Sequence, residues 1–257
     1  EGEAKKLAFA TGQNCSDLKS MRSIKAMQWV DVQSGFQLPI VDGSVVAEEP
    51  GIRFQQGEQH AVPYLSGGNS YEGTIMPSYQ IDPEAYERVW SSFDPHWRRV
   101  YQKDFQKSPN LARKRLFGDE RYLLSALVLA EAMQLVATRS WLYFIDFLPS
   151  ALTEPTAGTP HGLDAWLLFS AAEEGDPESV ELSLRIRQYW INFARFGNPE
   201  GAIDQTDEEG EELWPSYQQS GEWKRFANGD RVSIVELTKR LTVALARYQL
   251  RVKGSPE

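Results

Sequence analysis

The chain has 257 residues, 41% of them hydrophobic and 12% aromatic, a composition that fits a packed globular protein and excludes a disordered one. The formal net charge is −9 and no basic cluster is present, which argues against nucleic acid or an anionic membrane surface as the partner. No apolar run reaches the length that a membrane span requires.

Cysteine and histidine are rare in this chain. There is one cysteine, Cys15, so no disulfide can form within the chain, and we expect a buried thiol. The spacing of Cys15, His60, His96 and His161 matches no pattern of metal ligands. The sequence therefore predicts neither a metal nor another cofactor.

The amino-terminal region predicts short helices. Residues 3–12 have the pattern of one helix, and a second helix is expected from a cap at Ser16 or Asp17 to about Val32. Residues 37–46 are expected to be extended around an Asp-Gly turn.

The first strongly marked strand lies at residues 62–66, after a polar stretch at 48–59 that predicts a loop. Gly67 and Gly68 follow the strand and permit backbone angles that a side chain would resist. They can therefore present Glu72 beyond the carboxyl end of the strand, where open α/β sheets place their sites.

An aromatic-rich segment spans residues 74–118. Much of it has helical spacing, as Tyr86, Trp90 and Phe93 show. One interpretation is core packing under surface helices. The other is a cap whose aromatic side chains, among them Trp90, Phe93 and Trp97, line the entrance for a substrate.

A second strand is expected at residues 141–147, after a helix over 119–138 that Asp119 can cap. A loop over residues 149–160 follows this strand and leads to His161. The same pattern thus occurs twice, once as a strand followed by an acid and once as a strand followed by a histidine.

The carboxyl-terminal region predicts two long helices. Asp176 and Pro177 are good residues to begin the first, which should run to Phe196 and end at Gly197. The other expected elements are a solvated acidic loop at 204–212, a short strand at 223–226 and a last helix at 232–250.

Five segments resemble the type-B carboxylesterases, the family that includes the cholinesterases. The turn Gly-Asn-x-x-Glu-Gly at 68–73 and the loop His-Gly-Leu-Asp-Ala-Trp at 161–166 are similar to the acid and histidine segments of that family. The other three similar segments are Leu38–Gly43, Tyr189–Pro199 and Trp214–Tyr217. All five follow the order of the family and span nearly the whole chain.

This resemblance implies an α/β-hydrolase fold, here the carboxyl-terminal portion of a mostly parallel central sheet flanked by helices. Residues 74–118 would be a cap or gorge-lining region. The resemblance also implies hydrolysis of a small carboxylic ester through a Ser-His-Glu triad and an acyl-enzyme. His161 would be the general base and Glu72 the acid that orients it, in the chain order of α/β-hydrolases.

The nucleophile of that family lies in a Gly-x-Ser-x-Gly pentad, and no such pentad is present here. The glycine-rich oxyanion segment is also absent, and both are expected upstream of Glu1. Residues 1–257 are therefore expected to be the carboxyl-terminal part of one domain, with the upstream half as partner. Both predicted strands are almost wholly apolar, so each should be central in a sheet that the upstream half completes.

Two other functions stay open. One is a non-catalytic binding or adhesion module of the same fold, which the presence of Glu72 and His161 disfavours and the missing serine allows. The other is an amidase or lactonase on the same triad, since the pocket selects the bond that is cleaved. The cellular location is not indicated, and the sequence upstream of Glu1 would discriminate best.

Overall fold

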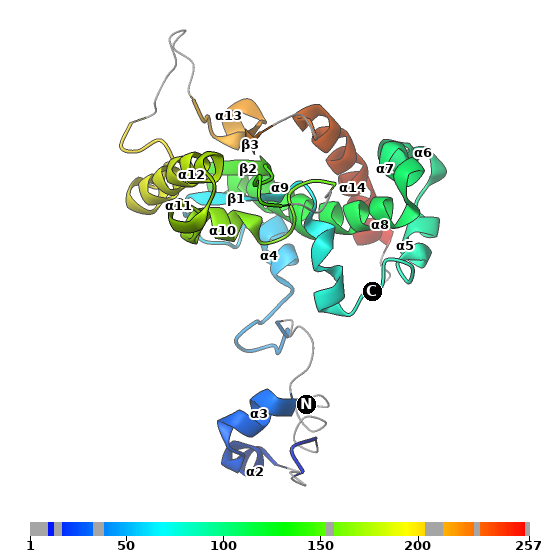
Figure 1. The fold of residues 1–257 in the computed structure, drawn as a ribbon. Coiled ribbons are helices and arrows are strands. Elements are labelled where there is room, and N and C mark those ends of the chain that lie inside the picture. Colours follow the sequence, from blue (N-terminus) through cyan, green and yellow to red (C-terminus); the bar gives the residue numbers. More distant parts are fainter. Residues whose placement is uncertain are drawn as a thin grey trace. The chain divides into compact units, whose positions relative to one another are not determined.

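The computed structural model describes residues 10–12, 17–32, 39–152, 157–203, 213–228 and 232–254 (Figure 1). The chain divides into two compact units. The smaller unit comprises residues 1–39 with 78–80, and the larger comprises residues 40–77 with 81–257.

The described part of the smaller unit contains α2 (Leu18–Ser23) and α3 (Ala26–Val32). The predicted cap is confirmed, because the Asp17 carboxylate accepts a 2.8 Å hydrogen bond from the Ser20 amide. The prediction of one continuous helix is wrong, because the backbone is extended at Ile24 and ends α2 there. Residues 3–9 of the first predicted helix lie outside the described residues, as does Cys15.

A parallel sheet forms the centre of the larger unit. Its described strands are β1 (Tyr64–Asn69), β2 (Ser140–Asp146) and β3 (Trp223–Ala227), in the order β1-β2-β3. Because all neighbours are parallel, the carboxyl ends of the three strands lie at one edge of the sheet. The three predicted strands are confirmed, although the first extends further than expected and includes Gly67 and Gly68.

Helices cover both faces of this sheet (Figure 1). Side chains of β2 alternate between the two faces, as expected of a buried parallel strand. Leu142 and Phe144 pack with α9 (Leu124–Ala132) and α14 (Ile234–Gly254). The opposite face packs against three further helices, α10 (Leu163–Phe169), α11 (Ala171–Glu174) and α12 (Pro177–Phe196).

One long helical stretch leads from the aromatic segment to β2. It consists of α8 (Pro109–Gly118), a π-helical turn η3 (Asp119–Leu123), α9 and the 3₁₀ turn η4 (Met133–Val136). The prediction that Asp119 caps a helix is wrong, because Asp119 has helical backbone angles inside this stretch. Its carboxylate instead accepts a 2.6 Å hydrogen bond from Nε of Arg240.

The polar stretch at 48–59, predicted as a loop, contains the helix α4 (Pro50–Gln56). Proline is favoured at the first helical position, and Gly57 ends the helix with a φ of 73°. A polar segment with Pro50 and Gly51 fits a loop equally well, which explains the error. At the preceding turn, Asp42 accepts hydrogen bonds from the amides of Ser44 and Val46, and the described residues of 39–46 form no strand.

The boundaries of α12 are as predicted. Asp176 accepts from the Ser179 amide at 2.9 Å, and Gly197 ends the helix with a φ of 67°. The short helix α13 (Tyr217–Ser220) precedes β3, and α14 confirms the predicted last helix. The acidic run at 204–212 lies outside the described residues.

The aromatic segment folds into short helices around a core of its own. Trp90, Phe93 and Tyr101 are buried there with Ala112 and Leu116 of α8. The elements are the 3₁₀ helix η1 (Glu72–Tyr79), α5 (Glu87–Ser92), α6 (Pro95–Arg98), the 3₁₀ turn η2 (Arg99–Tyr101) and α7 (Gln102–Lys107).

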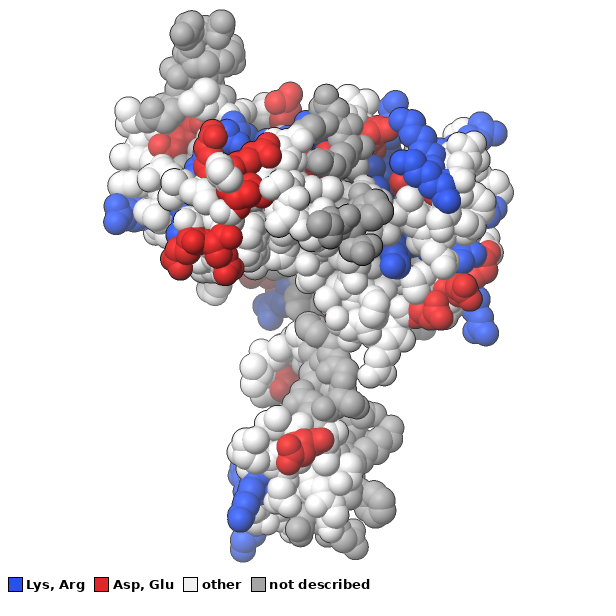
Figure 2. Space-filling view, viewed as in Figure 1, with Lys and Arg blue, Asp and Glu red and all other residues white. Residues whose placement is uncertain are grey.

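The described surface carries both signs of charge. Figure 2 shows acidic and basic side chains in small neighbouring groups on the face in view. None of the helices in the described part of the chain is both long and apolar enough to span a bilayer.

Candidate active site

Two loops meet at the carboxyl edge of the sheet. Tyr71, just after β1, donates its amide to the Thr159 carbonyl at 2.9 Å and forms a parallel bridge with Pro160. The His161 amide donates to Oγ1 of Thr74 at 2.8 Å. These contacts join the loop after β1 to the loop after β2 and bring their functional side chains together.

Glu72 and His161 are in direct contact. Oε2 of Glu72 is hydrogen-bonded to Nδ1 of the imidazole, which confirms the proximity that the sequence predicts. A carboxylate accepts only, so Nδ1 donates its proton, and the neutral ring then has its lone pair at Nε2. Within the described residues Nε2 has no hydrogen-bond partner, and the side chain is 34% exposed. The ring can therefore take a proton at Nε2.

The hydrogen bond to Glu72 raises the pKa of His161 above its ordinary value. The negative charges of Glu72 and Asp164 act in the same direction, and partial burial of the ring opposes them. The pair thus stabilises the imidazolium form, which is the form that a general base adopts after it accepts a proton.

The second oxygen of Glu72 is held in place by Asn69. Oε1 accepts from the Asn69 amide at 2.6 Å and from Nδ2 of Asn69 at 3.0 Å. The same Nδ2 donates to Asp164, whose other oxygen accepts from the Tyr143 hydroxyl at 3.1 Å. Asn69 and Asp164 were not singled out from the sequence, although both lie within the two segments that carry the resemblance.

Close backbone approach brings α8 against the acid. A Cβ at Gly73 would lie 2.0 Å from the Lys114 carbonyl oxygen, and one at Gly118 would lie 2.9 Å from Cβ of Glu72. Glycine at both positions therefore lets the end of α8 pack directly on the start of η1, where Glu72 is buried at 4% exposure.

The three aromatic residues predicted to line the substrate entrance differ in their exposure. Trp90 and Phe93 are 4% and 1% exposed and pack against Tyr101, so their burial favours core packing. Trp97 is partly exposed and packs edge-on against Phe93. Tyr122 lies in the π-helical turn, and its ring centroid is 5.0 Å from that of His161. This tyrosine was not singled out from the sequence.

The serine nearest in sequence to Glu72 is not free to act as the nucleophile on this pair. Ser70, the nearest in sequence to Glu72, is buried and donates its hydroxyl to Asp146 at 2.8 Å. Its oxygen also accepts from the Thr159 amide. This hydroxyl therefore joins the two loops instead of facing a substrate.

Comparisons with known proteins show the family of this chain. The sequence model of the carboxylesterase family matches residues 3–245. Carboxylesterase 4A of Bos taurus is 27% identical over 246 residues, which cover 84% of this chain and 43% of the bovine protein. Acetylcholinesterase of Bungarus fasciatus is 26% identical over 209 residues, covering 70% of this chain and 34% of that protein.

The fold is also that of a solved carboxylesterase. The crystal structure of the carboxylesterase EST55 of Geobacillus stearothermophilus at pH 6.2 superimposes with a TM-score of 0.65 at 18% identity. It covers 87% of this chain and 50% of the other, so the α/β-hydrolase fold is shared. The chain thus spans half or less of the length of these relatives. The family match extends over most of the chain, and on this ground the chain belongs to the carboxylesterase family.

Proposed function

We propose that the protein containing this chain hydrolyses carboxylic esters, with His161 as general base and Glu72 as the acid that orients it. The observation that carries the proposal is the contact between Oε2 of Glu72 and Nδ1 of His161, with Nε2 left without a partner among the described residues. We further propose that the nucleophilic serine and the oxyanion donors belong to a segment upstream of residue 1.

The chemistry follows from the two ring nitrogens. The upstream serine would give its proton to Nε2 while its oxygen attacks the ester carbonyl. Glu72 stabilises the resulting imidazolium through Nδ1. The proton then passes from Nε2 to the departing alcohol, which leaves an acyl-enzyme. Water repeats the sequence at the acyl carbon and releases the carboxylic acid.

The direct test is the His161→Ala variant of the full-length protein. We expect kcat for a short aryl ester such as p-nitrophenyl acetate to fall by about 10⁶-fold, because the serine loses its base. The matched control is His60→Ala, which removes an exposed histidine of the same chain outside the site. An ordinary melting curve with nearly normal kcat in the His161→Ala variant would contradict the assignment.

A fluorophosphonate probe separates the remaining functions. A reactive serine should be labelled in the wild-type protein and labelled much more slowly in His161→Ala. If the wild-type protein neither reacts with the probe nor hydrolyses esters, the non-catalytic binding module is correct. If it reacts with the probe and cleaves anilides or lactones in preference to esters, the amidase or lactonase is correct.

A further inference from the structure

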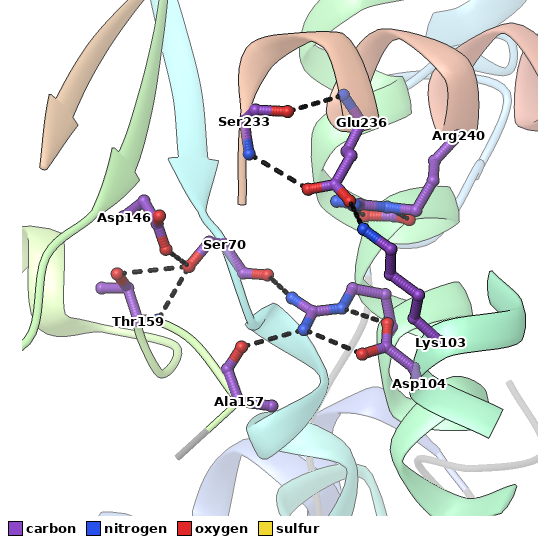
Figure 3. A network of polar contacts seen from close by, with 11 residues as sticks. Ser70, Lys103, Asp104, Asp146, Ala157, Thr159, Ser233, Glu236 and Arg240 are labelled. Carbon is purple, nitrogen blue, oxygen red and sulfur yellow. Dashed lines mark hydrogen bonds and ion pairs between the residues drawn. The ribbon is translucent and has the colours of Figure 1, made fainter. Parts of the chain in front are cut away.

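A buried arginine lies beside the candidate site without touching its two principal residues. Arg115 of α8 is 4% exposed. Its Nε donates to Asp104 at 2.9 Å, one terminal nitrogen donates to the Ser70 carbonyl, and the other donates to the Ala157 carbonyl at 2.9 Å. Figure 3 shows these three acceptors converging on one guanidinium group.

The two carbonyl acceptors belong to the two site loops. Ser70 lies two residues before Glu72, and Ala157 lies four residues before His161. Arg115 thus bonds the backbone of the acid's loop and the backbone of the histidine's loop from one planar group. Its fixed fork sets the separation of these two carbonyls, which a flexible point charge such as lysine cannot do.

The charge of Arg115 is compensated locally. Asp104 pairs with it, and the Tyr71 ring lies 5.1 Å from the guanidinium carbon. Burial raises the pKa of Tyr71 to about 12, so that phenol stays neutral at ordinary pH. With its charge balanced by Asp104, Arg115 acts on the loops mainly through geometry.

We propose that Arg115 is a positioning residue that keeps Glu72 and His161 at hydrogen-bonding distance by holding their loops together. Its catalytic consequence rests on the proposed function, and its structural consequence does not. The hydrogen bond from Nδ1 of His161 to Glu72 depends on where the two loop backbones lie. Arg115 fixes that position from outside the site.

The ionisation of His161 reports this distance with a diagnostic sign. The groups that face the ring are Glu72, Asp164 and the phenol Tyr122, and Tyr143 is hydrogen-bonded to Asp164. Loss of a nearby cation would by charge alone raise the pKa of His161. Loss of the Glu72 contact would lower it. A fall in the pKa of His161 therefore indicates that its contact with Glu72 has weakened.

The experiment compares Arg115→Met and Arg115→Lys with wild type in the full-length protein. Imidazole titration by NMR, with ¹³C-labelled histidine, gives the pKa of His161. We expect it to fall in both variants, and the acid limb of the kcat/KM profile to move to lower pH. A misplacement of about 1 Å costs about 100-fold, so we expect kcat to fall by about that factor with little change in KM.

Arg240→Lys is the matched control. Arg240 is equally buried at 4% exposure and also pairs with an aspartate, Asp119, but it bonds neither site loop. We expect this variant to lose stability and to keep the pKa of His161. If Arg115→Met does not fold, Arg115→Lys and Asp104→Asn supply the measurement, and Asp104→Asn should show a smaller fall.

An unchanged or raised pKa of His161 in Arg115→Lys, with unchanged kcat, would overturn the positioning role. An equal fall in Arg240→Lys would also overturn it, because any buried arginine would then have the same effect. A fall specific to Arg115 in a protein without esterase activity would support the positioning role and refute the proposed function alone.

Discussion

At the scale of single residues, the site depends on how Glu72 divides its two oxygens. Asn69 occupies Oε1 with two donors, so Oε2 is left for His161. Asn69 is in turn held at the end of β1, opposite Ile145 of β2. The sheet register therefore positions the Asn69 donors that occupy one carboxylate oxygen and leave the other for the imidazole.

Replacement of Glu72 by glutamine separates orientation from charge. The amide has one acceptor oxygen where the carboxylate has two, and it cannot stabilise the imidazolium, so we expect kcat to fall by about 10⁴-fold, as when a triad acid becomes an amide. The pKa of His161 should fall as well, because its largest raising influence is this hydrogen bond. Steady-state kinetics and histidine NMR measure the two effects, and Glu120→Gln is a control carboxylate outside the pair.

The same pair predicts a pH dependence of stability. Because the folded pKa of His161 is raised, the stabilisation is fully present below the unfolded pKa and is lost as pH rises through the folded pKa. Urea unfolding from about pH 5.5 to about pH 9 should show wild type losing this increment, and Glu72→Gln lacking it. Parallel pH curves for the two proteins would refute the linkage.

At the scale of elements, sequence patterns predicted the strands and the capped helix α12 because local signals decide them. An unbroken apolar run gives β2, and Asp176 with Pro177 begins α12 at the expected residues. The role of Asp119 could not be predicted, because its partner Arg240 is 121 positions away and tertiary pairing overrides the capping tendency.

The difference between local signals and tertiary pairing also explains why only part of the candidate site could be predicted. The contact between Glu72 and His161 could be predicted because each residue follows a marked strand and lies in a segment with a family resemblance. Arg115 carries no local signal, because its acceptors are backbone carbonyls brought together only by the fold. Trp90 and Phe93 do carry a sequence signal, but it is ambiguous, since helical spacing fits core and substrate-lining residues equally well.

The contact between α8 and η1 gives a prediction at this scale. A Cβ at Gly73 would lie 2.0 Å from the backbone oxygen of Lys114, so Gly73→Ala should force the two elements apart and cost about 3 kcal/mol. Gly51→Ala, also within a helix, is the control, since the nearest atom to a Cβ at that position would be 3.9 Å away. It should be neutral or stabilise by up to about 1 kcal/mol.

Urea unfolding measures both glycine variants, and ester hydrolysis by the full-length protein adds a second reading. In Gly73→Ala the fraction of activity lost should exceed the fraction of folded protein lost, because the displaced residue is the neighbour of Glu72. Equal stabilities of Gly73→Ala and Gly51→Ala would show that α8 does not press on the site.

At the scale of the whole molecule, the question is which edges of the described strands are paired. β2 pairs with a strand on each side, which confirms the sequence expectation that it is central. β1 is also expected to be central, and in the described residues it pairs with β2 alone. Its other edge would then offer unpaired backbone groups for association.

We therefore expect residues 1–257 expressed alone to aggregate or to bind a hydrophobic dye, and to lack esterase activity at any pH. The reason is that, under the proposed division of the triad, this chain supplies the base without the serine, and the unpaired edge of β1 would be exposed. Co-expression with that half should restore a monodisperse protein and turnover, as measured by light scattering and aryl ester hydrolysis. Co-expression with the upstream half carrying alanine at its pentad serine is the matched control, and it should restore solubility without activity. A monodisperse, cooperatively melting and active 257-residue monomer would show that a serine of this chain attacks the ester, and the proposed division of the triad would then be wrong.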